Sequence, residues 1–145
     1  MLSILKKKPI LKDLIPPNYV DIHSHLLPGI DDGSKSVEET ENLMSQMNGL
    51  GIRHFITTPH IYTNVWDNTE AIITENLKAT QTELAGKDCF SSMKAGAEYM
   101  IDSFFMKRLE TEPLLTLKDN YLLVEMSYLH PPIQLFEILF EIQLA

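Results

Sequence analysis

The sequence predicts an α/β fold of about four parallel strands that alternate with helices. Two observations predict this class. Short apolar runs rich in β-branched and aromatic residues alternate with longer segments that carry apolar residues at helical spacing. In addition, each predicted strand ends beside a residue that can bind a metal ion, and α/β proteins carry their sites at the carboxyl ends of parallel strands.

The composition is that of a single globular domain. The chain has 145 residues, of which 44% are hydrophobic and 22% are charged. Its net charge of −8 argues against binding nucleic acid through a general basic surface. Cys89 is the only cysteine, which excludes an internal disulfide and a cysteine-rich zinc site. The chain shows neither a signal-peptide core nor a run of the ~18 apolar residues that a membrane span needs, so we expect a cytoplasmic protein.

Residues 1–18 are predicted to form a basic N-terminal extension, and residues 19–145 the domain. The extension contains a lysine cluster and ends at Pro16-Pro17, which breaks the chain before the first strand. We interpret it as a solvated tail or a flap over the domain. The alternative is a weak contact between the lysines and a membrane surface or a partner protein.

The first predicted strand, residues 19–22, leads into the motif DIHSHLLPGIDDG. The period-2 alternation of a strand would place His23 and His25 on the same side. Asp31 and Asp32 follow within a glycine-containing loop and offer carboxylate oxygens beside the two imidazoles. A His-x-His pair alone is a weak signal, and Asp-Asp-Gly also occurs in ordinary turns.

Each remaining predicted element has a local signal. Ser36 and Glu39 have the spacing of a capping box, Asn68 can cap the second helix, and Pro131 can begin the last helix. The predicted elements in order are a helix that begins at Ser36 and ends at Gly49 and Gly51, a strand at 52–58, a helix after Asn68 that ends before Gly86, a strand at 91–97, a helix at 102–109, a strand at 121–126 and a helix at 131–145.

The later strands also end at candidate ligands, namely His60, Glu98 and Glu125. Glu98 and Glu125 have apolar neighbours, where an unpaired carboxylate would be costly, so each is expected to have a partner or a cation. His60 could instead be an exposed loop residue. His54 is interpreted as structural, and the role of His130, in a proline-rich loop at the rim, stays open.

The motifs DIHSHLLPGIDDG, TTPH, GAEYM and LLVEMSY resemble, in this order, those of the polymerase-and-histidinol-phosphatase (PHP) superfamily. Within it, residues 19–145 are similar to the bacterial capsule-type manganese-dependent protein-tyrosine phosphatases. The resemblance implies the N-terminal part of a distorted (β/α)7 barrel, with further ligands and the phosphate-binding arginines expected past residue 145. We therefore expect a truncated chain, weakly active or inactive, that covers its exposed apolar surface by self-association.

The resemblance also implies a set of site residues. Asp31 is expected to orient the loop or a ligand imidazole. Tyr62 and His130 are placed at the rim by their positions in the chain and not by the resemblance. Manganese is the expected cofactor, with iron, zinc and magnesium as alternatives. No catalytic residue is implied beyond the metal ligands, which are His23, His25, Asp32, His60, Glu98 and Glu125.

The implied activity is hydrolysis of phosphotyrosine by a metal-bound hydroxide, with a bacterial tyrosine kinase as the substrate protein. A cysteine nucleophile is excluded because the arginine needed six positions after Cys89 is Ala95. One alternative is a PHP-type phosphoesterase acting on a metabolite such as histidinol phosphate or on a nucleic-acid phosphodiester. Another is a non-catalytic fragment that binds metal and self-associates. Tyr62 and Trp66 either stack on a substrate ring or cover the rim of the domain.

Overall fold

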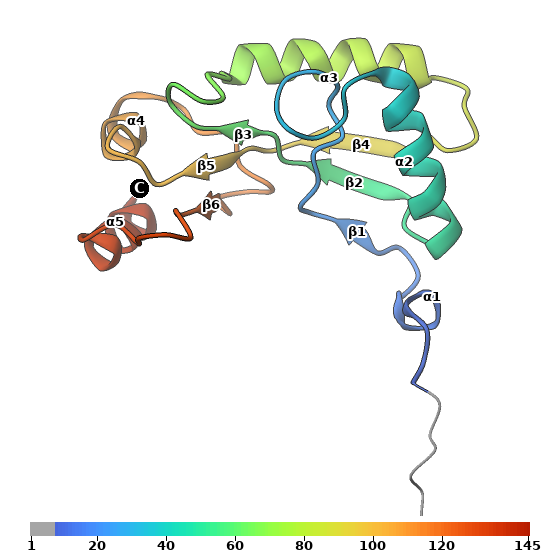
Figure 1. Cartoon of the computed structure of the whole chain (residues 1–145), viewed down its shortest axis with the longest axis horizontal. Coiled ribbons are helices and arrows are strands. Elements are labelled where there is room, and N and C mark those ends of the chain that lie inside the picture. The colour runs from blue at the N-terminus through green and yellow to red at the C-terminus, as the bar shows by residue number, and fades with distance from the viewer. Residues whose placement is uncertain (1–7) are drawn as a thin grey trace, which may run out of the picture.

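The structure, a computed structural model that describes residues 8–145, has an α/β fold with parallel strands. Six strands in the described residues form two three-stranded sheets, and every pairing within them is parallel (Figure 1). One sheet contains, in spatial order, β1 (Val20–Asp21), β2 (His54–Thr57) and β4 (Ser92–Ala95). The other contains β3 (His60–Ile61), β5 (Glu98–Met100) and β6 (Leu123–Glu125).

Two of the predicted strands are shorter than expected, and each is followed by a further strand in the other sheet. The predicted strand 52–58 stops at Thr57, and the chain resumes as β3 only after Pro59, which has no N–H for a strand ladder. The predicted strand 91–97 stops before Gly96 and resumes as β5. The predicted strands 52–58 and 91–97 are therefore confirmed in their central parts as β2 and β4, whereas β3 and β5 were not predicted. The paired segments stay together through the break, because Gly96 N–H donates to Thr57 O at 2.9 Å.

Five helices in the described residues complete the fold. They are α1 (Leu11–Leu14), α2 (Val37–Leu50), α3 (Glu70–Leu84), α4 (Phe105–Thr111) and α5 (Leu135–Leu144). Figure 1 shows α3 running along the sheets, and this helix contacts both β4 and α2. The predicted apolar stripe of α3 faces the core, with Ile73, Thr80 and Leu84 buried and Leu77 packed against them.

The helix starts follow their local signals only in part. Ser36 Oγ accepts from Glu39 N–H at 3.2 Å, as the capping box predicts, but the Glu39 carboxylate accepts from Lys35 N–H at 2.8 Å. The prediction that Asn68 caps α3 was wrong, because Thr69 Oγ1 accepts from Ile72 N–H at 3.3 Å.

The last two helices begin later than predicted. The helix α4 begins at Phe105 rather than Asp102, and the Asp102 carboxylate accepts from Phe104 N–H at 2.7 Å just before it. The helix α5 begins at Leu135, four residues after the proline taken as its start.

The N-terminal segment is described only from residue 8. Two of its lysines, Lys6 and Lys7, lie outside the described residues, so the structure describes only part of the predicted extension 1–18. Within it, α1 has no buried residue. No helix in residues 8–145 combines the length and apolar character that crossing a membrane requires.

Large apolar side chains are exposed along the C-terminal segment. Ile133 and Phe136 are 105% and 86% exposed, and Leu129, Phe140 and Leu144 are also largely exposed. In contrast, Ile138 of α5 is buried in the core. One face of α5 therefore packs on the domain, and the other carries apolar residues that the described chain does not cover.

Candidate metal centre

The loop that follows β1 is fixed against the end of β2 on both sides of His25. Thr57 Oγ1 donates to Ser24 O at 2.7 Å and accepts from Leu26 N–H at 2.9 Å. Thr58 N–H also donates to Ser24 O at 2.7 Å. The two histidines of the motif thus project from a fixed loop, and β1 itself ends at Asp21. Sequence reasoning gave Thr57 no role, although the threonine pair before Pro-His was a visible signal.

Asp31 orients the imidazole of His25. Its side chain is fully buried, and Oδ2 lies 2.7 Å from His25 Nδ1. The same oxygen accepts from His60 N–H at 3.1 Å, while Oδ1 accepts from Gly33 N–H at 2.9 Å. A carboxylate at Nδ1 retains the proton there, so the lone pair of Nε2 faces the interior of the site.

These hydrogen bonds shift the pKa values of both His25 and Asp31. The hydrogen bond to Asp31 raises the pKa of His25 above 6.5, against the opposing effect of burial and with help from the nearby carboxylates. Burial alone would raise the pKa of Asp31, but hydrogen bonds from His25 and from two backbone N–H groups outweigh it and lower that pKa below 3.8. The pair therefore favours a carboxylate beside a protonated Nδ1.

Glycine is the only residue type that fits at position 33 of the loop. A Cβ added there would lie 2.3 Å from both Cβ and O of His25. Ser34 N–H donates to His25 O at 3.0 Å, so the loop folds directly back onto this histidine. The Asp-Asp-Gly sequence is thus more than an ordinary turn, because its glycine allows the carboxylate of Asp31 to reach the imidazole.

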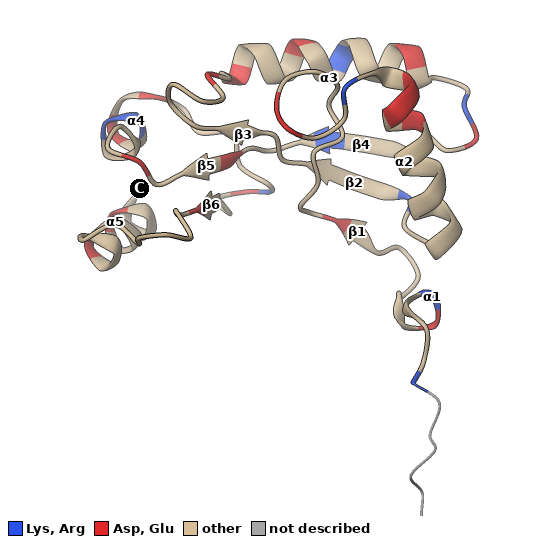
Figure 2. Ribbon diagram, viewed as in Figure 1, with Lys and Arg blue, Asp and Glu red and all other residues tan. Residues whose placement is uncertain are grey.

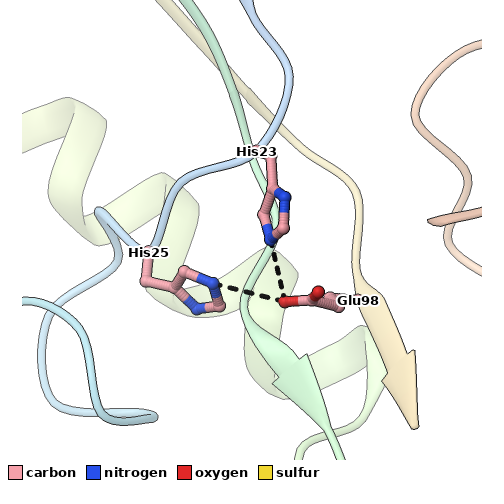
Figure 3. A group of neighbouring side chains, drawn as sticks. All are labelled: His23, His25 and Glu98. Atoms are coloured by element: carbon pink, nitrogen blue, oxygen red, sulfur yellow. Dashed lines mark ion pairs between the residues drawn. The ribbon is translucent and has the colours of Figure 1, made fainter. Parts of the chain in front are cut away.

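Three imidazoles meet at one carboxylate oxygen of Glu98. Glu98 Oε2 lies 3.1 Å from His23 Nε2, 3.3 Å from His25 Nε2 and 3.5 Å from His60 Nδ1. Figure 3 shows His23 and His25 projecting from the loop toward Glu98, which comes from β5. The Glu98 side chain is almost completely buried, whereas that of His23 is 52% exposed.

Two further residues extend this cluster from His60. Glu125 Oε1 lies 2.7 Å from His60 Nδ1, and Asp32 Oδ1 lies 3.5 Å from His60 Nε2. The side chain of Asp32 is 65% exposed, and that of Glu125 is partly buried. The structure thus brings together all six residues predicted as ligands, in three overlapping groups that share His25, His60 and Glu98.

The donor atoms are spaced as ligands of a divalent cation are spaced. Bonds of about 2.1 Å to a shared ion would separate neighbouring donors by about 3.0–3.4 Å. The distances from Glu98 Oε2 to the nitrogens of His23 and His25 lie in that range, at 3.1 and 3.3 Å. His60 Nδ1 is buried without a hydrogen-bond partner, despite its short distance to Glu125, which is expected of a nitrogen whose lone pair serves a cation.

The charge of the cluster also favours a cation. Acidic residues occur on both β5 and β6 (Figure 2). Burial raises the pKa of Glu125 above 4.5, the neighbouring Glu98 acts in the same direction, and the interaction with the His60 imidazole opposes both effects. Within the described residues, no Lys or Arg forms an ion pair with Glu98 or Glu125. A bound cation would supply the missing positive charge.

Asn68 is a positioning residue that sequence reasoning missed. Its amide donates to His60 O at 2.8 Å and to Ile30 O at 2.9 Å, so it joins the segment that carries His60 to the Asp-Asp-Gly loop. Asn76 Nδ2 donates to Pro28 O at 2.9 Å and holds the start of the same loop. No local pattern marks these contacts, which span 38 and 48 residues of sequence.

The two predicted rim residues lie in different places. Tyr62 lines a cavity together with His60 and Glu125, at the edge of the cluster. His130 lines another cavity, with Asp102 and Ile138, which contains none of the six candidate ligands. His54 donates to or accepts from Ser92 Oγ at 2.7 Å, between β2 and β4 and outside the cluster.

The fold and the site define a class, namely an α/β protein with a histidine–carboxylate centre where parallel strands meet a folded loop. Residues 19–145 match the family described as "Capsular polysaccharide synthesis, CpsB/CapC". The chain belongs to this family.

Named relatives support that assignment. The chain is 29% identical over 126 residues to the tyrosine-protein phosphatase YwqE of Bacillus subtilis, covering 86% of this chain and 50% of the relative. It is 32% identical over 112 residues to the tyrosine-protein phosphatase CpsB of Streptococcus pneumoniae, covering 74% of this chain and 45% of the relative.

The structural comparison agrees with the sequence comparison. A crystal structure from work on YwqE and CpsB, described as unique metal-dependent tyrosine phosphatases, matches with a TM-score of 0.78 and 29% identity. The match covers 87% of this chain and 51% of that chain. The chain thus spans about half the length of the relatives that it matches.

Proposed function

We propose that the chain carries the metal-binding part of a manganese-dependent protein-tyrosine phosphatase that acts in capsule or exopolysaccharide regulation. The observation that carries this proposal is the meeting of three imidazoles at Oε2 of Glu98. Membership in the CpsB/CapC family and relatives named as tyrosine-protein phosphatases support the reaction. The proposed substrate is a phosphorylated bacterial tyrosine kinase in the cytoplasm.

The proposed ligands are six side chains of two chemical types. Imidazole nitrogens and carboxylate oxygens suit manganese, and iron, zinc and magnesium are the alternatives. Divalent ions bound there would lower the pKa of water and neutralise the charge of phosphate oxygens. The ligands are His23, His25, Asp32, His60, Glu98 and Glu125.

The other residues around the centre would position these ligands. Asp31 keeps the proton of His25 on Nδ1, and Thr57 fixes the backbone on both sides of that histidine. Neither arginine of the chain serves the centre, because Arg108 pairs with Glu112 at 2.8 Å and Arg53 precedes β2, at the opposite end of that strand from Thr57. We therefore propose that the 145-residue chain has weak activity or none.

We further propose that residues 19–145 form part of a distorted (β/α)7 barrel, with residues 1–18 as an extension. The parallel pairing of every strand in the described residues supports this architecture. The hydrogen bonds from Gly96 N–H to Thr57 O and from Glu98 N–H to Pro59 O continue the pairing of the two chain segments through the gap between the sheets, which supports one curved sheet.

The test is a calorimetric titration of the chain with Mn²⁺. We expect Glu98→Gln to weaken Mn²⁺ binding at least about tenfold, because one carboxylate oxygen faces three imidazoles. The matched control is Glu83→Gln, on the exposed side of α3, and it should bind Mn²⁺ as the unmodified chain does. If the unmodified chain does not bind Mn²⁺, the proposal is wrong.

Phosphate release then tests the substrate. Any activity of the Mn²⁺-loaded chain should favour a phosphotyrosine peptide over histidinol phosphate. A higher rate with histidinol phosphate would instead support a phosphoesterase for small metabolites. If Mn²⁺ binds and a chain extended to the full length of its relatives releases phosphate from neither substrate, the non-catalytic interpretation replaces ours.

A further inference from the structure

An open cavity of about 370 Å³ adjoins the candidate metal centre. Two of its lining residues, His60 and Glu125, belong to one of the three groups of candidate ligands. The cavity therefore opens directly onto that group. Its volume is within the range of about 300–1,000 Å³ that is typical of small-molecule sites.

The walls of the cavity are aromatic and apolar. Apart from the two candidate ligands and Ser127, the lining residues are aromatic or carry an aliphatic or thioether side chain, and no Lys or Arg is among them. They are Tyr62, Val65, Trp66, Met100, Met126, Tyr128 and Leu129. A site that combines acidic and imidazole groups at one end with aromatic walls at the other suits a ligand with a phosphate and a ring.

The wall that contains Tyr62 and Trp66 is a closed turn. Tyr62 N–H donates to Trp66 O at 3.0 Å, and Trp66 N–H donates to Tyr62 O at 2.7 Å. Asn64 adopts the left-handed conformation that the turn requires, with φ of 64°, and its N–H donates to Asp67 Oδ1 at 2.7 Å. The two half-buried aromatic residues are thus held in place before any ligand binds, which reduces the entropy cost of binding.

The opposite wall is the segment that follows β6. Tyr128 is 95% exposed, and Met126 and Leu129 are also exposed. These side chains lie immediately after the candidate ligand Glu125. An exposed aromatic ring beside a cavity that leads to a charged centre is available to stack on a ligand.

We propose that this cavity is the subsite for the aromatic ring of an aryl phosphate monoester. The inference rests on the proposed function, which places the phosphate group at the candidate metal centre. The ring lies between the turn of residues 62–66 and the segment 126–129. An alkyl phosphate such as phosphoserine leaves these walls uncovered, so the cavity selects aryl over alkyl substrates.

The test uses two phosphonates that carry the same charged group and resist hydrolysis. The Mn²⁺-loaded 145-residue chain is titrated with phenylphosphonate and with methylphosphonate, by calorimetry and by fluorescence. Trp66 is the only tryptophan and therefore reports on the cavity directly. We expect phenylphosphonate to bind about 3- to 10-fold more tightly and to change the Trp66 emission, since one aromatic contact contributes about that much.

Two variants identify the residues responsible. Trp66→Leu should weaken phenylphosphonate binding about 3- to 10-fold and leave methylphosphonate binding unchanged. Tyr19→Leu, which changes an exposed aromatic residue outside the cavity, should alter neither affinity. The comparison of the two phosphonates on the unmodified chain remains informative even if Trp66→Leu does not fold.

The failures of the two proposals are distinguishable. Equal affinity for the two phosphonates, or binding of neither by a chain that binds Mn²⁺, would overturn the aryl subsite while leaving the metal centre in place. Absence of Mn²⁺ binding in the direct titration would overturn the proposed function, and the aryl subsite with it.

Discussion

Replacement of Asp31 by asparagine tests whether this buried carboxylate sets the orientation of His25. The carboxylate accepts three hydrogen bonds, from His25 Nδ1, His60 N–H and Gly33 N–H. Asparagine has the same shape but only one acceptor oxygen. If the amide oxygen replaces Oδ2, the amide nitrogen faces Gly33 N–H; if it replaces Oδ1, the nitrogen faces His60 N–H. One buried donor loses its partner in either arrangement, at a cost of about 1–3 kcal/mol.

The second arrangement also changes the tautomer of His25. An amide that donates to Nδ1 moves the imidazole proton to Nε2, the atom that lies 3.3 Å from Glu98 Oε2. A protonated Nε2 cannot bind a metal ion. We therefore expect Mn²⁺ affinity to fall by about 10- to 100-fold, which is about 1.4–2.8 kcal/mol.

The assay compares Asp31→Asn with Asp88→Asn, which removes the same charge at an exposed position outside the centre. Free Mn²⁺ is measured by electron paramagnetic resonance during titration, and thermal unfolding is followed with and without Mn²⁺. The unmodified chain should gain about 2.7 kcal/mol at 100 times its Kd. Equal Mn²⁺ affinity in Asp31→Asn and the unmodified chain would refute the orienting role.

Asp31→Asn should also change how the unfolding free energy of the metal-free chain depends on pH. The pKa of His25 is raised above 6.5, so its contribution to stability is fully present below pH 6.5 and is lost as the pH rises through the folded-state pKa. The pKa of Asp31 is lowered below 3.8, so its contribution is fully present above pH 3.8 and is lost as the pH falls. The unfolding free energies of the unmodified chain and Asp31→Asn should therefore differ most between pH 3.8 and 6.5, as chemical denaturation can measure.

Three other substitutions test separate parts of the structure. Gly33→Ala would place a Cβ 2.3 Å from His25 Cβ and should destabilise the chain by about 1–3 kcal/mol in urea unfolding. The control Gly49→Ala adds a Cβ in open space on α2 and should stabilise the chain by about 0.5–1 kcal/mol. Thr57→Val removes both hydroxyl hydrogen bonds beside His25 and should lower the unfolding free energy by about 1–3 kcal/mol and weaken Mn²⁺ binding. Unchanged Mn²⁺ affinity would contradict the positioning role of Thr57. We expect the chain to self-associate through its exposed apolar segment, so Phe136→Ser should lower the mass measured by analytical ultracentrifugation, and a monomeric unmodified chain would contradict this.

Local sequence patterns predicted the elements of this fold better than their boundaries. Each of the four segments predicted as strands contains a strand, and the apolar stripe of α3 is buried as its spacing indicates. The helix caps were less predictable. Ser36 caps α2, but Thr69 rather than Asn68 caps α3, because both residue types suit a cap and the Asn68 amide has distant partners.

The contacts that position the candidate ligands had no local signal. Thr57 Oγ1 and Ser24 O are 33 residues apart in sequence, and Asn68 and Ile30 are 38 apart. Such hydrogen bonds depend on how the loop folds back over the sheet, which periodicity and turn chemistry do not encode. The motif residues themselves were visible in the sequence, because histidines and acidic residues are conspicuous beside apolar strands.

Two strands that the sequence did not predict, β3 and β5, carry the middle of the candidate centre. After the break at Pro59, β3 begins at His60, and after the break at Gly96, β5 begins at Glu98. Parallel pairing aligns His60 with Glu98, so an imidazole and a carboxylate lie side by side where the two sheets join. The sequence prediction ended each strand at its candidate ligand. In the structure, Glu125 does end β6, but His60 and Glu98 begin new strands at a bend. Departures from regular structure are expected where a site imposes its own geometry, and this bend lies at the candidate site.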